Sequence, residues 1–355
     1  MLTRLVTLAL VCLSPVAAHA KSWCAMPLYV HEWGVHVLAS GRTTAPSFVA
    51  DFFHSPANTK AFAPVVPVRS LPADGGERDL PLIHFYSSRR NAPIPVAIEV
   101  GFKLGGATRW WPDVDVFDPN GAVELSWQRL DLATKPAAPL GQVPPWGETA
   151  RKIDDALWVN GGASSERFVF YEGKTTEPAP ITFERGPTWQ SDRRHYVIKN
   201  TGAHAVHDVM FIHHAANKTY LFVAPAIPAR SSAGFIIEDH PVDAKTLPGM
   251  LRTMLELDPN SRDRPSDDCV MQRDPATAFS VAAGHRLYTP EVDLILSVWQ
   301  QRFFGTTQAV QTTILYREDA AYLAEVMPLS LYTDMFNYVV LNRASLALWE
   351  KVVLP

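Results

Sequence analysis

Short apolar runs, each bounded by Gly, Pro or Asn, recur along much of the chain and predict β-strands. The clearest series lies between His195 and Ile237, where four such runs follow one another at residues 195–199, 206–213, 219–223 and 232–237. Short strands at this spacing, with turn residues between them, are typical of two packed antiparallel sheets. We therefore expect a mainly β fold with an immunoglobulin-like β-sandwich core.

The pattern changes to helical spacing after residue 240. In the segment 289–304, apolar residues recur three and four positions apart, Pro290 stands in the first turn and Gly305 follows the last one. Together these features predict a helix. A second helix is expected at 247–257, followed by an α+β arrangement to the end of the chain. The expected organisation is a β-rich sandwich domain over residues 21–240 and an α+β C-terminal region over residues 241–355.

Residues 1–20 have the pattern of a secretory signal peptide. Arg4 supplies the positive start, residues 5–13 the apolar stretch, and Ala18-His19-Ala20 the small-residue cleavage site. Cleavage is expected after Ala20, which predicts a soluble periplasmic or secreted protein. Later apolar runs fall short of the roughly 18 residues that indicate a membrane helix, so no integral membrane segment is expected after cleavage.

Charge and composition narrow the class of partner. Loss of residues 1–20 removes Arg4 from the 32 basic residues and leaves 31 against 36 acidic ones, a formal charge of −5. A chain without a basic field is not expected to bind nucleic acid. The 29 prolines and 19 glycines, spread without a period, favour a loop-rich β architecture over a helical bundle.

Two cysteines, Cys24 and Cys269, remain in the expected mature chain. In an oxidising compartment a single pair predicts a disulfide. Closing a loop of this length would stabilise the fold by up to about 5 kcal/mol and tie the N-terminus to the C-terminal region. The alternative is a free thiol, although neither cysteine has a neighbouring base in the sequence that would make it reactive.

The segment 29–37, Tyr-Val-His-Glu-Trp-Gly-Val-His-Val, is expected to be the first strand. Alternation places His31 and Trp33 on one face and Glu32 and His36 on the other. Glu32 and His36 would be roughly 13 Å apart, too far to share one metal ion unaided. We expect Trp33 in the core and the polar face at a surface or sheet edge. A Glu32 buried without a cation partner would instead be a candidate general acid or base.

Histidines supply the candidate metal ligands. His213 and His214 are adjacent, so on a strand they point to opposite faces and cannot chelate one ion together. The spacing matches no structural zinc motif, and a site here would need a further ligand from His31, Glu32 or His84. His31, His84 and His213 are therefore the candidate ligands for a divalent transition metal.

The sequence also resembles a family of uncharacterised bacterial exported proteins that carry an N-terminal His-Glu-Trp-Gly motif, present here at residues 31–34. Three later segments are similar to that family, at residues 82–87, 167–173 and 298–304. The family pattern continues with Thr-Phe-Thr, where this chain has Val35-His36-Val37. The resemblance implies a grouping with exported proteins and assigns no catalytic residue.

Two functions from different classes follow from these observations. The first is an exported envelope protein with a binding or structural role. The alternative is a metal-dependent hydrolase or oxidoreductase that uses Glu32 and histidines gathered from the sheet. Metal content of the mature protein discriminates between them, as does the spatial arrangement of His31, Glu32, His84 and His213.

Overall fold

The structure is a computed structural model that describes residues 23–25, 28–38, 76–88, 93–117, 124–186, 195–237, 241–258, 270–272, 281–333, 339–350, 352 and 354. The expected signal peptide at residues 1–20 and Cys269 lie outside these ranges. No helix in the described ranges is long and apolar enough to span a membrane.

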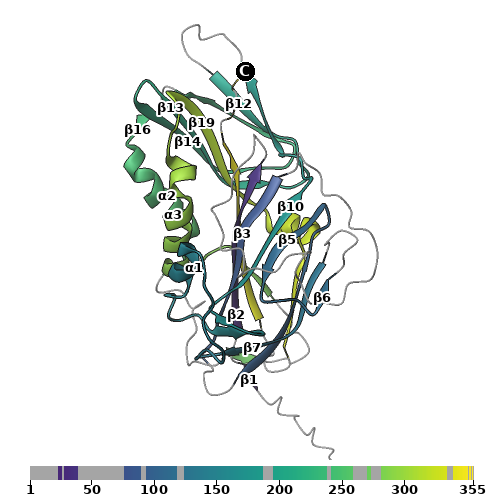
Figure 1. Cartoon of the computed structure of the whole chain (residues 1–355). Helices are drawn as coiled ribbons and strands as arrows, with labels where there is room; N and C mark the ends of the chain where they lie inside the picture. The colour runs from purple at the N-terminus through teal and green to yellow at the C-terminus, as the bar shows by residue number, and fades with distance from the viewer. Residues whose placement is uncertain are drawn as a thin grey trace, which may run out of the picture.

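A ten-stranded sheet forms the centre of the described fold (Figure 1). In spatial order its strands are β16 (Pro241–Val242), β14 (Lys218–Ile227), β13 (Val206–Ala215), β19 (Val310–Glu318), β21 (Val339–Trp349), β2 (Leu28–Leu38), β3 (Gly76–Tyr86), β10 (Val169–Thr175) and β5 (Gly105–Trp111), and β18 (Val281–Gly284) also pairs with β21. Strand β2 runs parallel to β21 and antiparallel to β3. Strands from both sides of residue 240 therefore belong to one sheet.

Smaller sheets complete the β structure. One contains β20 (Leu329–Tyr332), β4 (Ile94–Gly101), β7 (Glu124–Ala133), β8 (Trp158–Asn160) and β9 (Ser165–Glu166), with β6 (Val116–Phe117) beside β7. Another contains β11 (Ile181–Arg185), β12 (His195–Asn200) and β15 (Ser232–Ile236). The predicted mainly β class is confirmed. The immunoglobulin-like sandwich is not confirmed, because β13 and β14 continue into the long sheet through β19 and β21.

The three-stranded sheet does pack face to face on one end of the long sheet. Ile198 and Phe235 from β12 and β15 share a buried apolar cluster with Phe211 of β13 and Ile314 of β19. The Phe222 and Phe235 rings stack with centroids 4.5 Å apart. Burial of these side chains is what holds the two layers together.

Helices α1 (Pro145–Ala150), α2 (Leu247–Leu255) and α3 (Thr289–Phe304) lie together along one side of the long sheet (Figure 1). The predicted helix at 289–304 is confirmed, with Pro290 in its first turn and Gly305 after its end. Its apolar residues, among them Ile295 and Trp299, are buried. A fourth helix, α4 (Ala320–Val326), follows β19 and has Asp319 as its N-cap.

The expectation that the polar face of the first strand lies at a surface or edge is wrong. All eleven residues of β2 are buried. The physical reason is its position between β21 and β3, with α3 against one face and the region of α4 against the other. Alternating polar residues usually indicate one solvated face. Here Glu32 is paired with a buried arginine and a tyrosine hydroxyl, and His36 with a buried carboxylate.

The strand β1 (Trp23–Ala25) pairs antiparallel with β17 (Val270–Gln272), and Cys24 stands opposite Met271. Cys269 immediately precedes β17 in the sequence. This pairing brings the two chain regions together, and the Cys24–Cys269 disulfide stays a prediction.

Candidate functional site

One face of β2 carries a buried cluster around Glu291, the third residue of α3. His31 donates from Nδ1 to Glu291 Oε2 at 2.7 Å, because the Asn342 amide donates to His31 Nε2 at 3.1 Å. His84 Nδ1 lies 3.4 Å from Glu291 Oε1. Burial alone would raise the pKa of Glu291, but His31 and His84 hold it well below its usual range. Two of the predicted metal ligands thus meet around an ionised carboxylate.

Glu32 points to the opposite face, as strand alternation predicted. Arg343 Nη2 donates to Glu32 Oε1 at 3.1 Å, its Nε donates to Oε2, and the Tyr171 hydroxyl donates to Oε1. Arg343 also donates to the carbonyl of Met327 at 2.9 Å. The condition that would make Glu32 a general acid or base, burial without a cation, is therefore not met.

His213 lies elsewhere in the long sheet. Its Nδ1 is 2.9 Å from Thr312 Oγ1 of the neighbouring strand β19, and β13 is three strands from β2 in the sheet order. At the usual strand spacing this separation is about 14 Å. The structure brings His31 and His84 together and does not bring His213 to them.

A second buried cluster lies on the Glu32 face, around His36. His36 Nδ1 is 2.8 Å from Glu318 Oε1 and 3.8 Å from Glu177 Oε2. The guanidinium of Arg78 donates to both carboxylates. Ser345 donates to Glu318 at 2.6 Å. Burial would raise the pKa of Glu318, but Arg78 and His36 hold it well below its usual range.

The cluster around His36 has the donor types of a metal site. Ligand atoms of His36, Glu177 and Glu318 all lie within 4.8 Å of one another, and no other set of three is found in the described ranges. Arg78 already bridges the two carboxylates, however, and burial does not deprotonate it because Glu318 and Glu177 raise its pKa above its usual value. A metal ion would have to displace this guanidinium. The geometry therefore favours a network of ion pairs between Arg78 and the two carboxylates over a metal site.

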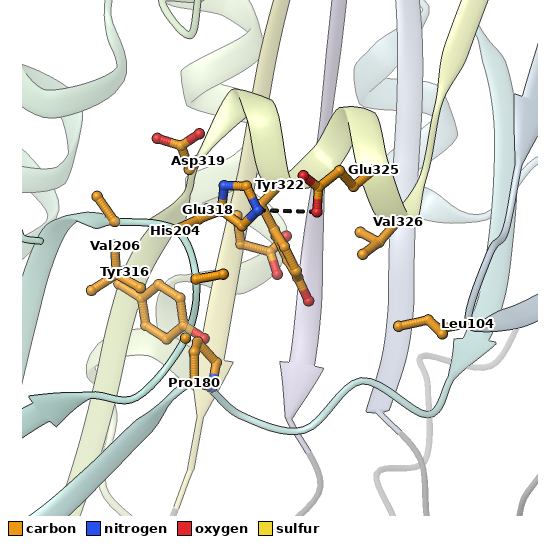
Figure 2. A pocket seen from close by; sticks show the side chains of 13 residues that line it. Leu104, Pro180, His204, Val206, Tyr316, Glu318, Asp319, Tyr322, Glu325 and Val326 are labelled. Atoms are coloured by element: carbon orange, nitrogen blue, oxygen red, sulfur yellow. Dashed lines mark hydrogen bonds and ion pairs between the residues drawn. The ribbon is translucent and has the colours of Figure 1, made fainter. Parts of the chain in front are cut away.

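A cavity of about 250 Å³ opens beside this network (Figure 2). Its lining comes from the end of β19, the helix α4, the turn before β13 and two segments from other sheets, and consists of Leu104, Pro180, Gly202, Ala203, His204, Ala205, Val206, Tyr316, Glu318, Asp319, Tyr322, Glu325 and Val326. Most of these surfaces are apolar. Glu318 belongs both to the lining and to the buried network, so the cavity gives access to that network.

Tyrosine and histidine side chains add to the acidic residues of the lining. The Tyr316 side chain is 1% exposed and its hydroxyl has no hydrogen-bond partner among the described residues. The Tyr322 hydroxyl donates to Glu177 at 2.9 Å. His204 Nε2 pairs with Glu325 Oε2 at 3.0 Å, and this pair is drawn as the dashed contact in Figure 2. Glu325 is largely exposed, which places the pair at the mouth.

Sequence reasoning singled out the strand that carries this site but missed most of its residues. Arg78, Glu177 and Glu318 are separated from one another by about 100 residues or more along the chain, so no local spacing signals their association. Tyr316 and Tyr322 follow ordinary strand and helix periodicity. Of the residues in this cluster, only His36 lies in the strand that the sequence analysis singled out.

Comparison with known proteins adds little to this geometry. No known protein-family pattern matches the chain, and no curated protein matches it. Among solved structures, the Fcho1 Mu homology domain from Danio rerio with bound Eps15 peptide is similar with a TM-score of 0.29 and 8% identity, over 94% of this chain and 97% of that chain.

Proposed function

We propose that the chain is an exported bacterial envelope protein that binds a small ligand in the cavity beside Glu318. Its export rests on the signal-peptide pattern of residues 1–20, and the periplasm or the cell exterior is its proposed location. A Cys24–Cys269 disulfide belongs to the same proposal, since such bonds persist in oxidising compartments.

One observation carries the binding proposal: a cavity of about 250 Å³ with mostly apolar walls lies beside the buried network and has Tyr322, Glu318 and Glu325 among its lining residues. Apolar walls around a few polar groups are the usual composition of a small-molecule site.

The size of the cavity limits the ligand. Ligand sites usually enclose about 300–1,000 Å³, and this cavity has about 250 Å³. The ligand should therefore be a small molecule, comparable in size to a single ring with a short substituent.

Ligand-observed NMR on residues 21–355 tests the proposal with three probes of similar shape: benzylamine, benzyl alcohol and benzoate. Leu104→Trp should abolish binding because it fills the cavity from a lining position. Leu140→Trp is the matched control, since Leu140 is similarly exposed and does not line the cavity. Binding that survives Leu104→Trp, or no binding of any probe to the unmodified protein, would exclude the proposal. Equal unfolding midpoints establish that both variants are folded.

The alternative, a metal-dependent hydrolase or oxidoreductase, is favoured by one observation, the clustered donors of His36, Glu177 and Glu318. The test is elemental analysis of the mature protein with and without His36→Ala. The binding proposal predicts no bound divalent ion and an unfolding midpoint unchanged by a chelator. One equivalent of metal that is lost in the His36→Ala protein would instead support the enzyme.

A further inference from the structure

We propose that the ligand of this cavity is a small organic cation, an ammonium group attached to an apolar body. This inference rests on the proposed binding function and names its ligand class. It comes from the charges of the lining and from the two aromatic rings among them.

The lining is acidic. Of its 13 residues, Glu318, Asp319 and Glu325 carry carboxylates, and none is lysine or arginine. Directly behind the lining, Arg78 is shared between Glu318 and Glu177. The four carboxylates of Glu177, Glu318, Asp319 and Glu325 and the one guanidinium of Arg78 sum to a formal charge of −3, before any histidine is counted. A cleft that is lined by one sign of charge attracts ligands of the opposite sign.

Two of the lining carboxylates have histidine partners, and neither contact requires the histidine to be charged. His204 contacts Glu325 at 3.0 Å and His207 contacts Asp319 at 2.8 Å. A neutral imidazole can donate one N–H in each of these contacts and leave the carboxylate negative. An anionic ligand would meet repulsion from the mouth to the base of the cavity. An ammonium group would meet attraction along the same path.

The aromatic rings supply the second part of the argument. Tyr316 stands at one side of the cavity and Tyr322 crosses its centre (Figure 2). Tyrosine faces attract cations through the ring quadrupole, and alkylated ammonium groups are recognised in this way. The apolar side chains of Leu104, Val206 and Val326 would contact the carbon body of the same ligand. Carboxylates, rings and apolar walls together fit an ammonium compound better than a neutral polar molecule.

The size of the cavity limits the probe for this inference. The probe should combine a cationic nitrogen with apolar carbon around it and be small enough for a cavity of about 250 Å³. Choline carries three methyl groups on a quaternary nitrogen, the kind of group that aromatic faces recognise, and is the probe for the test.

The test is isothermal titration of the mature protein with choline and two molecules of the same shape. 3,3-Dimethylbutan-1-ol replaces the cationic nitrogen by carbon, and 3,3-dimethylbutanoate carries a negative charge. We expect choline to bind at least about tenfold more tightly than the neutral alcohol, and the anion to bind most weakly. Equal or tighter binding of the alcohol or the anion would overturn the cation inference and leave the cavity function standing. If choline fails to bind while the benzyl probes bind, the cation inference is also wrong; if no probe binds, both proposals fail.

Removal of one carboxylate charge at the cavity mouth tests where the attraction for choline originates. Glu325→Gln should weaken choline binding by about two- to fivefold, the range expected for one exposed charge, and should leave the neutral alcohol unaffected. Glu148→Gln is the matched control, because Glu148 of α1 is similarly exposed, pairs with Arg151 directly after that helix, and does not line the cavity. An equal effect of both substitutions, or an equal effect on both ligands, would show that Glu325 does not attract the cation at the cavity mouth and would overturn the inference.

Discussion

Glu32 is a buried carboxylate whose oxygens are occupied by Arg343 and Tyr171. Its neighbour His31 points the other way and pairs with Glu291. At the scale of single residues, the His-Glu dipeptide therefore supplies two separate structural contacts, one on each face of β2. Its contribution is to the stability of the sheet, and the candidate ligand site lies next to a different histidine, His36.

Removing the cation from the Glu32 pair should be costly. Arg343→Met leaves Glu32 buried with only the Tyr171 hydroxyl, and we expect a loss of about 3–5 kcal/mol in the free energy of unfolding. Urea denaturation measures it. The double variant Glu32→Gln/Arg343→Met should recover part of the loss. Arg129→Ala, which removes an exposed partner of Asp131, should change stability by less than about 1 kcal/mol. A comparably small loss for Arg343→Met would contradict the pairing.

Asp79 should give the protein a distinctive pH dependence. Burial raises its pKa to about 6, beside the buried carboxyl of Glu172 and with Arg302 opposing the shift. In the unfolded chain the value is about 3.9. The folded state therefore holds more protons between about pH 4 and 6, and the contribution of this group to stability falls as pH rises through that window.

Asp79→Asn should remove this dependence. The free energy of unfolding of the wild type relative to Asp79→Asn should decrease by up to about 3 kcal/mol between pH 4 and pH 6.5. Urea titrations at several pH values measure the difference, with Asp131→Asn as a partly exposed control. A difference that is constant across the window would show that Asp79 titrates normally.

For single residues, the sequence predicted the direction in which a side chain points but not the residues that it contacts. Alternation correctly assigned His31 and Glu32 to opposite faces, because side-chain direction is a local property of a strand. It could not predict Arg343 or Glu291, which are more than 250 residues away. The burial of both faces depended on these partners and was therefore missed as well.

At the scale of elements, α3 and β2 are joined through one side chain. Glu291 accepts from the backbone N–H of Tyr288 at 2.8 Å, which caps the helix, and from His31 at 2.7 Å, which fixes the helix on the sheet. The sequence predicted the bounds of this helix well because proline, glycine and periodicity are local signals. The second role of Glu291 had no local signal.

Glu291→Gln should weaken both contacts, because a neutral amide accepts less strongly than a carboxylate from His31. We expect a loss of about 2–4 kcal/mol in the free energy of unfolding. Asp293→Asn on the same helix is the control, since Asp293 is exposed and pairs only with a partly exposed arginine among its described ion pairs. Chemical denaturation of both variants checks the prediction, and equal effects would refute the double role of Glu291.

At the scale of the whole molecule, the strands of the long sheet that come first and last along the chain lie next to each other in its interior. Strand β2, the first strand of this sheet along the chain, lies between β3 and the last one, β21, and pairs in parallel with β21 along its full length. The predicted domain boundary at residue 240 came from a change in local hydrophobic periodicity. Local patterns do not show which strands pair across the chain. The mainly β class was predictable because it depends only on strand content, which the pattern of each short segment shows.

A fragment of residues 21–240 should therefore not fold alone. It lacks β19 and β21, which would leave β2 and β13 each with an open edge and expose their buried faces. We expect circular dichroism without a cooperative thermal transition, in contrast to residues 21–355. A sharp transition in the fragment would show that the β-rich part is an autonomous domain.

The cavity is also a property of the whole molecule, because its lining comes from segments more than 200 residues apart, from Leu104 to Val326. The most direct test of the proposed function is fluorine NMR of residues 21–355 labelled with 3-fluorotyrosine, with signals assigned by Tyr316→Phe and Tyr322→Phe. Addition of benzylamine or benzyl alcohol should move the signals of Tyr316 and Tyr322 and leave that of Tyr86 in place. Signals that stay unchanged with both probes, or shifts confined to other tyrosines, would contradict ligand binding in this cavity.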